Sequence, residues 1–140
     1  MILNVKLDME KGALLPIRAH GTDAGADVLT PRSFLLAARS SAIIRTGVHV
    51  ELPPETVGML KSKSGLNIFH DIVGEGVIDE GFDGEVVVKL YNLGDVPYQF
   101  DRGDKIIQLV VMPVHYPAIE QVDEISGGER GDAGYGSTGR

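Results

Sequence analysis

Cysteine and tryptophan are both missing from this sequence of 140 residues. Without a thiol, the chain cannot form a disulfide scaffold, a thiolate zinc site or a cysteine nucleophile. It also lacks the G-x-x-x-x-G-K-[ST] phosphate loop and the G-x-S-x-G nucleophile turn. Its four histidines stand apart, without the paired spacing of a metal site. The most common thiol, metal and hydrolase motifs are therefore excluded.

Long apolar runs are missing as well. Met1-Ile2-Leu3 is soon interrupted by Asn4 and Lys6, so no signal-peptide core forms. No other run approaches the length of a membrane span. The sequence therefore predicts a soluble, cytoplasmic protein without a membrane partner.

Positive charge is scarce, because 13 Lys and Arg residues face 20 Asp and Glu residues for a formal net charge of -7. Such a surface repels the phosphate backbone, so no duplex nucleic-acid partner is expected. A small anionic ligand is compatible with this charge, since it needs only a few local donors.

Hydrophobic residues make up 43% of the chain, which is enough to build the core of one domain. Period-two alternation is frequent, whereas helical periodicity is nearly absent. The alternation predicts strands over Ala42–Leu52, Val57–Lys61, Glu85–Asn92 and Lys105–Val114. Only Ser64–His70 has room for a helical turn or two. Short strands separated by Gly and Pro turns predict an all-β sandwich or barrel.

Glycine is in excess, with 18 residues, six of them in the last 14 positions. The sequence predicts a β domain over residues 1–125 and a flexible glycine-rich C-terminal arm over residues 126–140, which has almost nothing to bury. Taken alone, the arm is typical of a disordered terminus. It also contains an aromatic residue and several donors that suit a phosphate ligand, namely Tyr135, Arg130, Ser137, Thr138 and Arg140.

Four further segments suit ligand chemistry, although each has a plain structural explanation when taken alone. Asp23–Val28 places two acids around a glycine, which is typical of an Asx turn or of a carboxylate that holds a hydrated cation. Lys61–Leu66 places Ser and Lys beside Gly, which is typical of a helix cap or a phosphate site. Val73–Glu85 indicates a tight hairpin or a ligand-facing backbone. Gly103–Leu109 places an amide in the most apolar strand, where it must find partners.

Taken in order, these segments resemble the five motifs of the trimeric dUTPase family (deoxyuridine triphosphate nucleotidohydrolases). Each motif is weak alone, but five in order at compatible spacing are specific. The resemblance runs from about Gly21 to Arg140, nearly the whole chain. The matching stretches are Asp23–Val28, Lys63–Leu66, Gly76–Glu85, Gly103–Gln108 and Arg130–Gly139.

The resemblance implies a jelly-roll β fold and a homotrimer, in which the arm of one subunit closes over a site formed by the others. It implies hydrolysis of dUTP to dUMP and pyrophosphate by attack of water at the α-phosphorus, with Mg²⁺ as cofactor. This reaction would keep uracil out of DNA and supply dUMP for thymidylate synthesis.

The resemblance also assigns roles to single positions. Asp79 would be the catalytic base that orients the attacking water, and Asp27 would hold Mg²⁺ through coordinated water. Ser64, the backbone N–H of Gly65 and Gln108 would bind the phosphate chain and stabilise the charge that develops on it.

The remaining roles concern the base, the sugar and the arm. Uracil would be recognised by backbone groups of Gly74, Gly76, Val77 and Ile78. Phe82 would pack on the deoxyribose and exclude a 2′-hydroxyl, and Tyr135 would stack on uracil when the arm closes. The phosphates would be engaged by Arg130, Gly136, Ser137 and Thr138.

Two positions depart from the family pattern, since Lys63 replaces the usual Arg and Phe82 the usual Tyr. Lys keeps the charge without the bidentate fork, and Phe keeps the ring without the hydroxyl. One rival reading is the related dCTP deaminase, whose active-site pattern differs. The other is a dUTPase-like protein that only binds nucleotide or a regulatory partner. The retained Asp27, Asp79 and Gln108 argue against lost catalysis.

Overall fold

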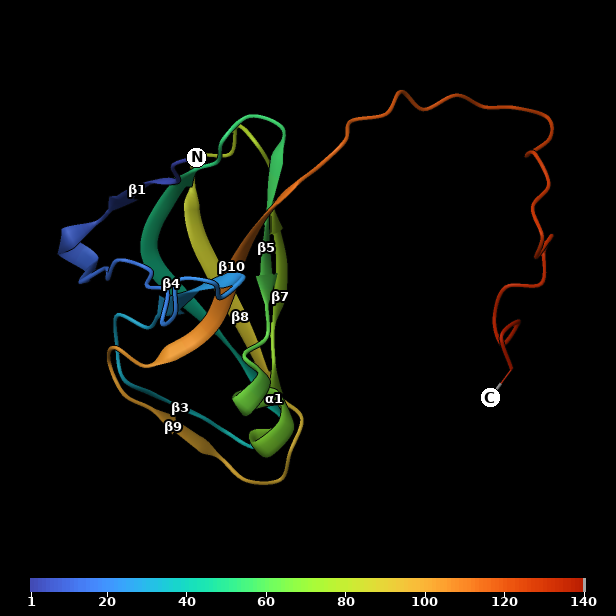
Figure 1. Ribbon diagram of the computed structural model, residues 1–140. Coiled ribbons are helices and arrows are strands. Elements are labelled where there is room, and N and C mark those ends of the chain that lie inside the picture. The colour runs from blue at the N-terminus through green and yellow to red at the C-terminus, as the bar shows by residue number, and fades with distance from the viewer. Residues whose placement is uncertain (140) are drawn as a thin grey trace.

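The computed structural model describes residues 1–139 and has two four-stranded antiparallel sheets that face each other (Figure 1). In spatial order, the first sheet contains β1 (Asn4–Leu7), β4 (Ser40–Glu51), β8 (Glu85–Asn92) and β6 (Ile72–Val73). The second contains β2 (Gly25–Leu29), β10 (Lys105–Pro113), β5 (Thr56–Lys61) and β7 (Glu75–Ile78). The predicted all-β fold is confirmed as a jelly-roll sandwich, and its sheets do not close into a barrel within these residues.

The hydrophobic core lies between the two sheets and follows from the alternation along the strands. In β8, Val86, Val88 and Leu90 are buried while the residues between them face outward. Burial of each Val, Leu or Ile contributes about 1.5–3 kcal/mol relative to leaving it exposed. Other buried members of the same cluster are Ile44, Val48, Leu60, Phe100, Ile107 and Leu109.

The predicted strands and the predicted helix are all present, with bounds within two residues of those expected. The helix α1 (Ser64–His70) ends at Asp71, whose backbone is left-handed with φ 56°. The short elements had no sequence signal, since a strand of two to four residues depends on distant partners. They include the 3-10 helix η1 (Met9–Lys11) and the pair β3 (Phe34–Leu36) and β9 (Tyr98–Phe100). No helix in the described chain is long and apolar enough to cross a membrane.

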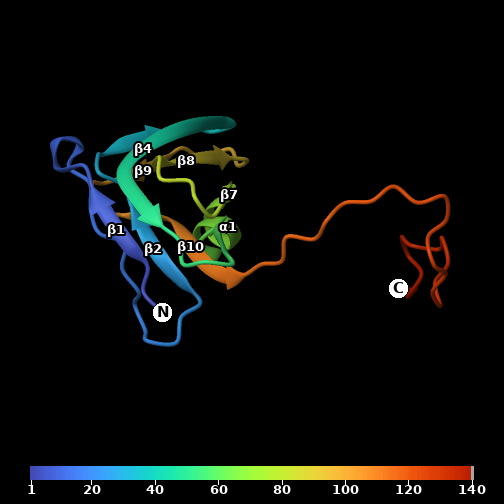
Figure 2. The same ribbon diagram turned by 90° about the horizontal axis from the view of Figure 1, so that it is seen from above.

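The C-terminal segment leaves the sandwich after β10. The N–H of Val114 still donates to the carbonyl of Glu55 at 3.0 Å, and the hydroxyl of Tyr116 donates to Glu80 at 3.1 Å. Residues 117–139 form no strand or helix and are exposed, and both views show them running away from the sandwich (Figures 1 and 2). The extended chain thus begins before residue 126, and the domain boundary at 125/126 stays a prediction.

Candidate functional site

A row of polar side chains crosses the outer face of the second sheet. Asp27 of β2 lies opposite Gln108 of β10, which lies opposite Lys61 of β5, which in turn lies opposite Glu75 of β7. Register partners in antiparallel strands point to the same face. The neighbouring residues Val28, Ile107, Leu109 and Leu60 point into the core. The fold therefore brings the acid of the first motif beside the amide of the fourth.

Asp27 is a buried carboxylate that is neutralised by two lysines. Its side chain is 6% exposed, and its oxygens pair with Lys63 through Oδ1 and with Lys105 through Oδ2 at 3.2 Å. An unpaired buried charge would be strongly destabilising, and the two ammonium groups supply the partners that the Asp27 carboxylate needs. Lys63 was a predicted site residue, whereas Lys105 was missed because only the β2–β10 pairing places it near Asp27.

Gln108 is fixed by its own strand neighbours. Its side-chain Nε2 donates to the backbone carbonyl of Ser62 at 3.0 Å, so its carbonyl oxygen is free for another partner. Gly25 lies directly beneath it, and a Cβ added there would come within 2.3 Å of Gln108 Oε1. Glycine is therefore required at this point of β2, because any side chain would displace the amide.

Replacing Gly25 by Ala should lower the free energy of unfolding by about 1–3 kcal/mol, since an added methyl overpacks a buried site. The change should also raise the KM for nucleotide by moving Gln108. Gly21→Ala is the matched control, because nothing lies within 4 Å of a Cβ at Gly21. Thermal unfolding of both variants checks the prediction, which is contradicted if they have equal stability.

The second predicted motif is located where α1 begins. Lys63 has an extended backbone (φ -73°, ψ 129°) and precedes Ser64 and Gly65 in the first helical turn. Backbone N–H groups in a first turn have no intrahelical acceptor, so they are available to a ligand. The side-chain hydroxyl of Ser64 is exposed, and no hydrogen bond within residues 1–139 occupies it. Donors for an anion therefore lie at the same end of β5 as the polar row.

A separate pocket of about 360 Å³ lies beside β7, the edge strand of the second sheet. Its walls include the predicted site residues Gly76, Val77, Ile78, Asp79 and Phe82, together with Leu60, Glu85, Val86 and Val87. Because β7 pairs with β5 on one side only, its other row of backbone N–H and C=O groups has no strand partner in the described chain. The residues predicted to contact uracil and the deoxyribose thus line the same cavity as Asp79, the predicted catalytic base. Gly74 lies outside it and binds the hydroxyl of Ser62 at 2.9 Å.

The turn after β7 is held at its first residues by the chain beside it. Phe82 N–H donates to the carbonyl of Asp79 at 3.1 Å, which closes the turn. Glu80 accepts hydrogen bonds from the backbone of Glu55 and from Tyr116. Burial, together with the Glu80 carboxylate, raises the pKa of the Tyr116 hydroxyl, which is the donor in this contact. The carboxylate of Asp79 is left exposed at the mouth of the pocket.

The polar row and the proposed base are far apart within one copy of the chain. Glu75 belongs to the row, and Asp79 follows it by four residues along and beyond β7. At about 3.3 Å per residue, this places Asp79 about 13 Å farther along. The arm residues Arg130, Tyr135, Gly136, Ser137 and Thr138 are exposed and distant from both places (Figure 1). A single copy therefore does not assemble all the predicted residues.

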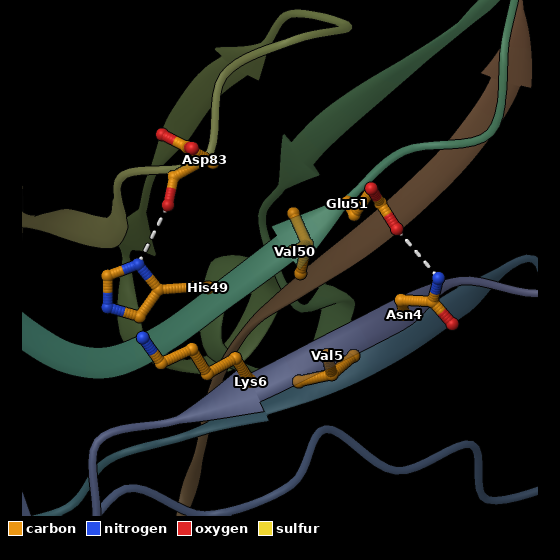
Figure 3. Close-up of a pocket in the computed structure, with 7 residues that line it drawn as sticks. All are labelled: Asn4, Val5, Lys6, His49, Val50, Glu51 and Asp83. Atoms are coloured by element: carbon orange, nitrogen blue, oxygen red, sulfur yellow. Dashed lines mark hydrogen bonds between the residues drawn. The ribbon is translucent and has the colours of Figure 1, made fainter.

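Another pocket, of about 310 Å³, is lined in part by Asp83 of the turn and contains none of the predicted site residues (Figure 3). Asn4 and Lys6 of β1, His49 and Glu51 of β4, and Asp83 line it. The imidazole of His49 points to the backbone carbonyl of Asp83 at 2.9 Å (Figure 3). The carbonyl can only accept, so Nδ1 of His49 is the donor. This contact holds Asp83, the residue next to Phe82 of the pocket beside β7.

The donor set near Asp27 fits an indirect metal contact. Among residues 1–139, no group of three or more His, Asp or Glu side chains could hold an ion. A lone carboxylate is too few ligands for a protein-bound Mg²⁺. It suits an ion that is held mainly by a triphosphate and keeps its waters, as Mg²⁺ commonly does. The residues present thus fit an Mg²⁺ ion that is held mainly by the triphosphate and keeps its waters.

Comparison with known proteins identifies the family of this chain. Residues 11–139 match the sequence model of the family described as dUTPase. The chain is 39% identical over 142 residues to deoxyuridine 5'-triphosphate nucleotidohydrolase of Clostridium acetobutylicum, covering 99% of this chain and 98% of that protein. It is 35% identical to the Mus musculus protein of the same name, covering 94% and 82%.

Solved structures give the same result. The dUTPase of Staphylococcus bacteriophage 80alpha with dUPNHPP has a TM-score of 0.91 at 32% identity, covering 99% of both chains. A mutant dUTPase from phage phi11 of S. aureus, described with a structural Mg(II) ion, has a TM-score of 0.80 at 31% identity, covering 91% of this chain and 100% of that one. Fold and site thus define a small all-β enzyme that acts on a nucleoside triphosphate. Within that class, the chain belongs to the dUTPase family.

Proposed function

We propose that this protein hydrolyses dUTP to dUMP and pyrophosphate in the cytoplasm, which keeps uracil out of DNA and supplies dUMP for thymidylate synthesis. The observation that carries the proposal is the pocket beside β7, where unpaired backbone, Asp79 and Phe82 meet. Two relatives with the name of this activity match the chain over 98% and 82% of their own length.

Uracil recognition follows from the free backbone of β7. Its N–H and C=O groups can match the O4, N3–H and O2 edge of uracil. Cytosine presents the opposite pattern at position 4, so it would leave a buried backbone group unpaired, which makes its rejection strong. Thymine carries only an extra methyl group, so rejecting it requires a tight pocket around Gly76 and Val77. The ring of Phe82 would pack on the deoxyribose at the mouth of the same pocket.

The chemical step would use Asp79 as the base that positions water in line with the α-phosphorus. Positioning and charge stabilisation dominate phosphoryl-group reactions, so placing the water in line matters more than strong basicity. Ser64, Gly65 and Gln108 would bind the phosphate chain as charge develops on it. Asp27 would hold Mg²⁺ through water, with Lys63 and Lys105 beside it. When bound, Mg²⁺ supplies positive charge on the triphosphate oxygens.

The active site would be shared between the subunits of a homotrimer. In one copy, the base lies about 13 Å beyond the row that would hold the phosphates, a gap that a neighbouring copy could close. Apolar side chains that a subunit contact would bury are exposed on the outer face of β4–β8 and on the segment that precedes the arm. They are Ile43, Val87, Tyr91, Ile119, Val122 and Ile125. Light scattering at several concentrations tests the trimer.

Tyr135→Ala should weaken nucleotide binding by about 1–3 kcal/mol, the value of one base–aromatic stack. The ring is fully exposed when the arm extends, so its removal should leave the folded domain unchanged. Calorimetric titration with a non-hydrolysable dUTP analogue measures the loss, and Tyr135→Phe is the matched control. Equal affinity of the alanine variant and the native protein would exclude the stacking contact.

A pyrophosphate-release assay over dUTP, dTTP, dCTP and UTP with Mg²⁺ tests the proposed reaction. We expect turnover of dUTP and little of the other three. Preference for another nucleotide would overturn the specificity. Ammonia release from dCTP would instead indicate the deaminase reaction, and nucleotide binding without turnover would indicate a binding protein.

A further inference from the structure

Three consecutive residues beside the pocket are each fixed by a different contact. The carbonyl of Asp83 accepts a hydrogen bond from His49 (Figure 3). The ring of Phe82 folds over Gly84 so closely that a Cβ there would lie 2.4 Å from its Cζ. The carboxylate of Glu85 binds two cations from other parts of the chain. The backbone on which Phe82 rests is thus held firmly on both sides.

Glu85 has the strongest of these contacts. Its side chain is only 7% exposed although it lines the pocket. Lys11 Nζ donates to Oε1 at 3.0 Å and to Oε2 at 3.2 Å, and Arg45 Nε donates to Oε1 at 3.0 Å. Burial opposes ionisation, but these hydrogen bonds outweigh it and hold the pKa of Glu85 below its ordinary value. The group is therefore a charged anchor at neutral pH.

The cations reach Glu85 because of an irregularity in β4. The register between β4 and β8 shifts between Arg45 and His49. Gly47 lies inside this bulge with φ 69°, and a Cβ there would come within 2.9 Å of Ala13. Bulges re-aim the side chains beside them. Here Arg45 and His49 on either side of the bulge reach Glu85 and the carbonyl of Asp83, while η1 supplies Lys11.

Phe82 rests on the backbone next to this anchor. Phe82 is 44% exposed, and its phenyl group has no hydroxyl that could form a hydrogen bond. The backbone of Gly84 is the surface against which it rests, so a shift at Glu85 moves the ring directly. A ring that excludes a hydroxyl group must be placed within a fraction of an ångström, since even a 1 Å misplacement can cost about 100-fold in rate.

We propose that Glu85, held by Lys11 and Arg45, is a positioning residue that sets the place of Phe82 and thereby the preference for dUTP over UTP. This inference rests on the proposed dUTP hydrolysis and adds three residues to its specificity. None of the three needs to touch the nucleotide, because they act through the backbone at Gly84.

The test compares kcat/KM for dUTP and UTP in Glu85→Gln and Arg45→Gln. The first variant keeps the shape of the side chain but removes its charge, and the second leaves Lys11 to neutralise Glu85. We expect the dUTP-to-UTP ratio to fall roughly tenfold in Glu85→Gln, part of the ~100-fold that a full 1 Å misplacement can cost. The fall should be smaller in Arg45→Gln. KM for UTP should decrease. This fold-change should be larger than any fold-change in kcat for dUTP.

Asp95→Asn is the matched control, because it removes an exposed carboxylate that pairs with Arg39 at 2.8 Å on another loop. An unchanged ratio in both anchor variants overturns the inference, even if both lose stability. If Glu85→Gln fails to fold, the ratio in Arg45→Gln decides, since that side chain is mostly exposed. Absence of dUTP turnover in the native protein would refute the proposed function instead, so the two failures are distinguishable.

Discussion

Replacing Asp79 by Asn should lower kcat for dUTP by roughly 100- to 10,000-fold, the usual contribution of a positioned general base. The amide keeps the size of the side chain but cannot accept the proton of the attacking water. Asp79 is exposed at the mouth of the pocket and makes no ion pair in the described chain, so stability should not change. Pyrophosphate release under saturating dUTP measures the effect.

A measurement of nucleotide binding distinguishes loss of the catalytic base from loss of the binding site. Because the substrate contacts remain, affinity for a non-hydrolysable dUTP analogue should be nearly native in Asp79→Asn. Asp95→Asn again serves as the control, since it makes the same chemical change on an exposed loop that does not line the pocket. Comparable turnover in Asp79→Asn would remove Asp79 from the mechanism. Loss of nucleotide binding would instead show that Asp79 contributes to binding of the substrate in the ground state.

The long strands were predictable because their signal is local. In β8, alternating residues settle both the strand and its buried face, and no distant partner has to be known. The bulge at Gly47 was not predictable, since it depends on how closely Ala13, just after η1, approaches it. The same holds for β3 and β9, which are short and become strands only through each other.

In the candidate site, too, some features could be predicted from the sequence and others could not. The side chains of Asp27, Asp79 and Gln108 were identified from the resemblance of motifs. Their surroundings come from pairings between residues far apart in sequence, such as Asp27 with Gln108. For this reason the sequence indicated Lys63 but not Lys105. Likewise, Glu85 had only the signal of an acid after a turn, whereas its role as an anchor depends on Lys11 and Arg45.

Deleting residues 126–140 should reduce kcat/KM for dUTP by about 100-fold or more while the sandwich stays folded. Residues 126–139 are exposed, and their backbone hydrogen bonds are local, as from Gly131 to Gly128 and from Ser137 to Gly134. The melting temperature should therefore be nearly unchanged. Activity should fall because an open site leaves water in contact with the phosphates and the reacting groups less well placed.

A full-length variant with Arg130, Tyr135 and Ser137 replaced by Ala is the control for the length of the arm. Loss of activity in this variant as well would assign the effect to the side chains. Unfolding on truncation would show that the arm is structural, and native turnover without it would exclude the arm from the site.

Mixing the two inactive proteins tests whether subunits share a site. The truncated chain keeps Asp79 but has no arm, whereas Asp79→Asn keeps the arm but has no base. If one copy formed a whole site, no mixture could recover activity. If base and arm come from different copies, co-refolded mixtures should regain part of the native turnover. Because the arm runs away from the sandwich that carries Asp79 in one copy (Figure 1), we expect this recovery.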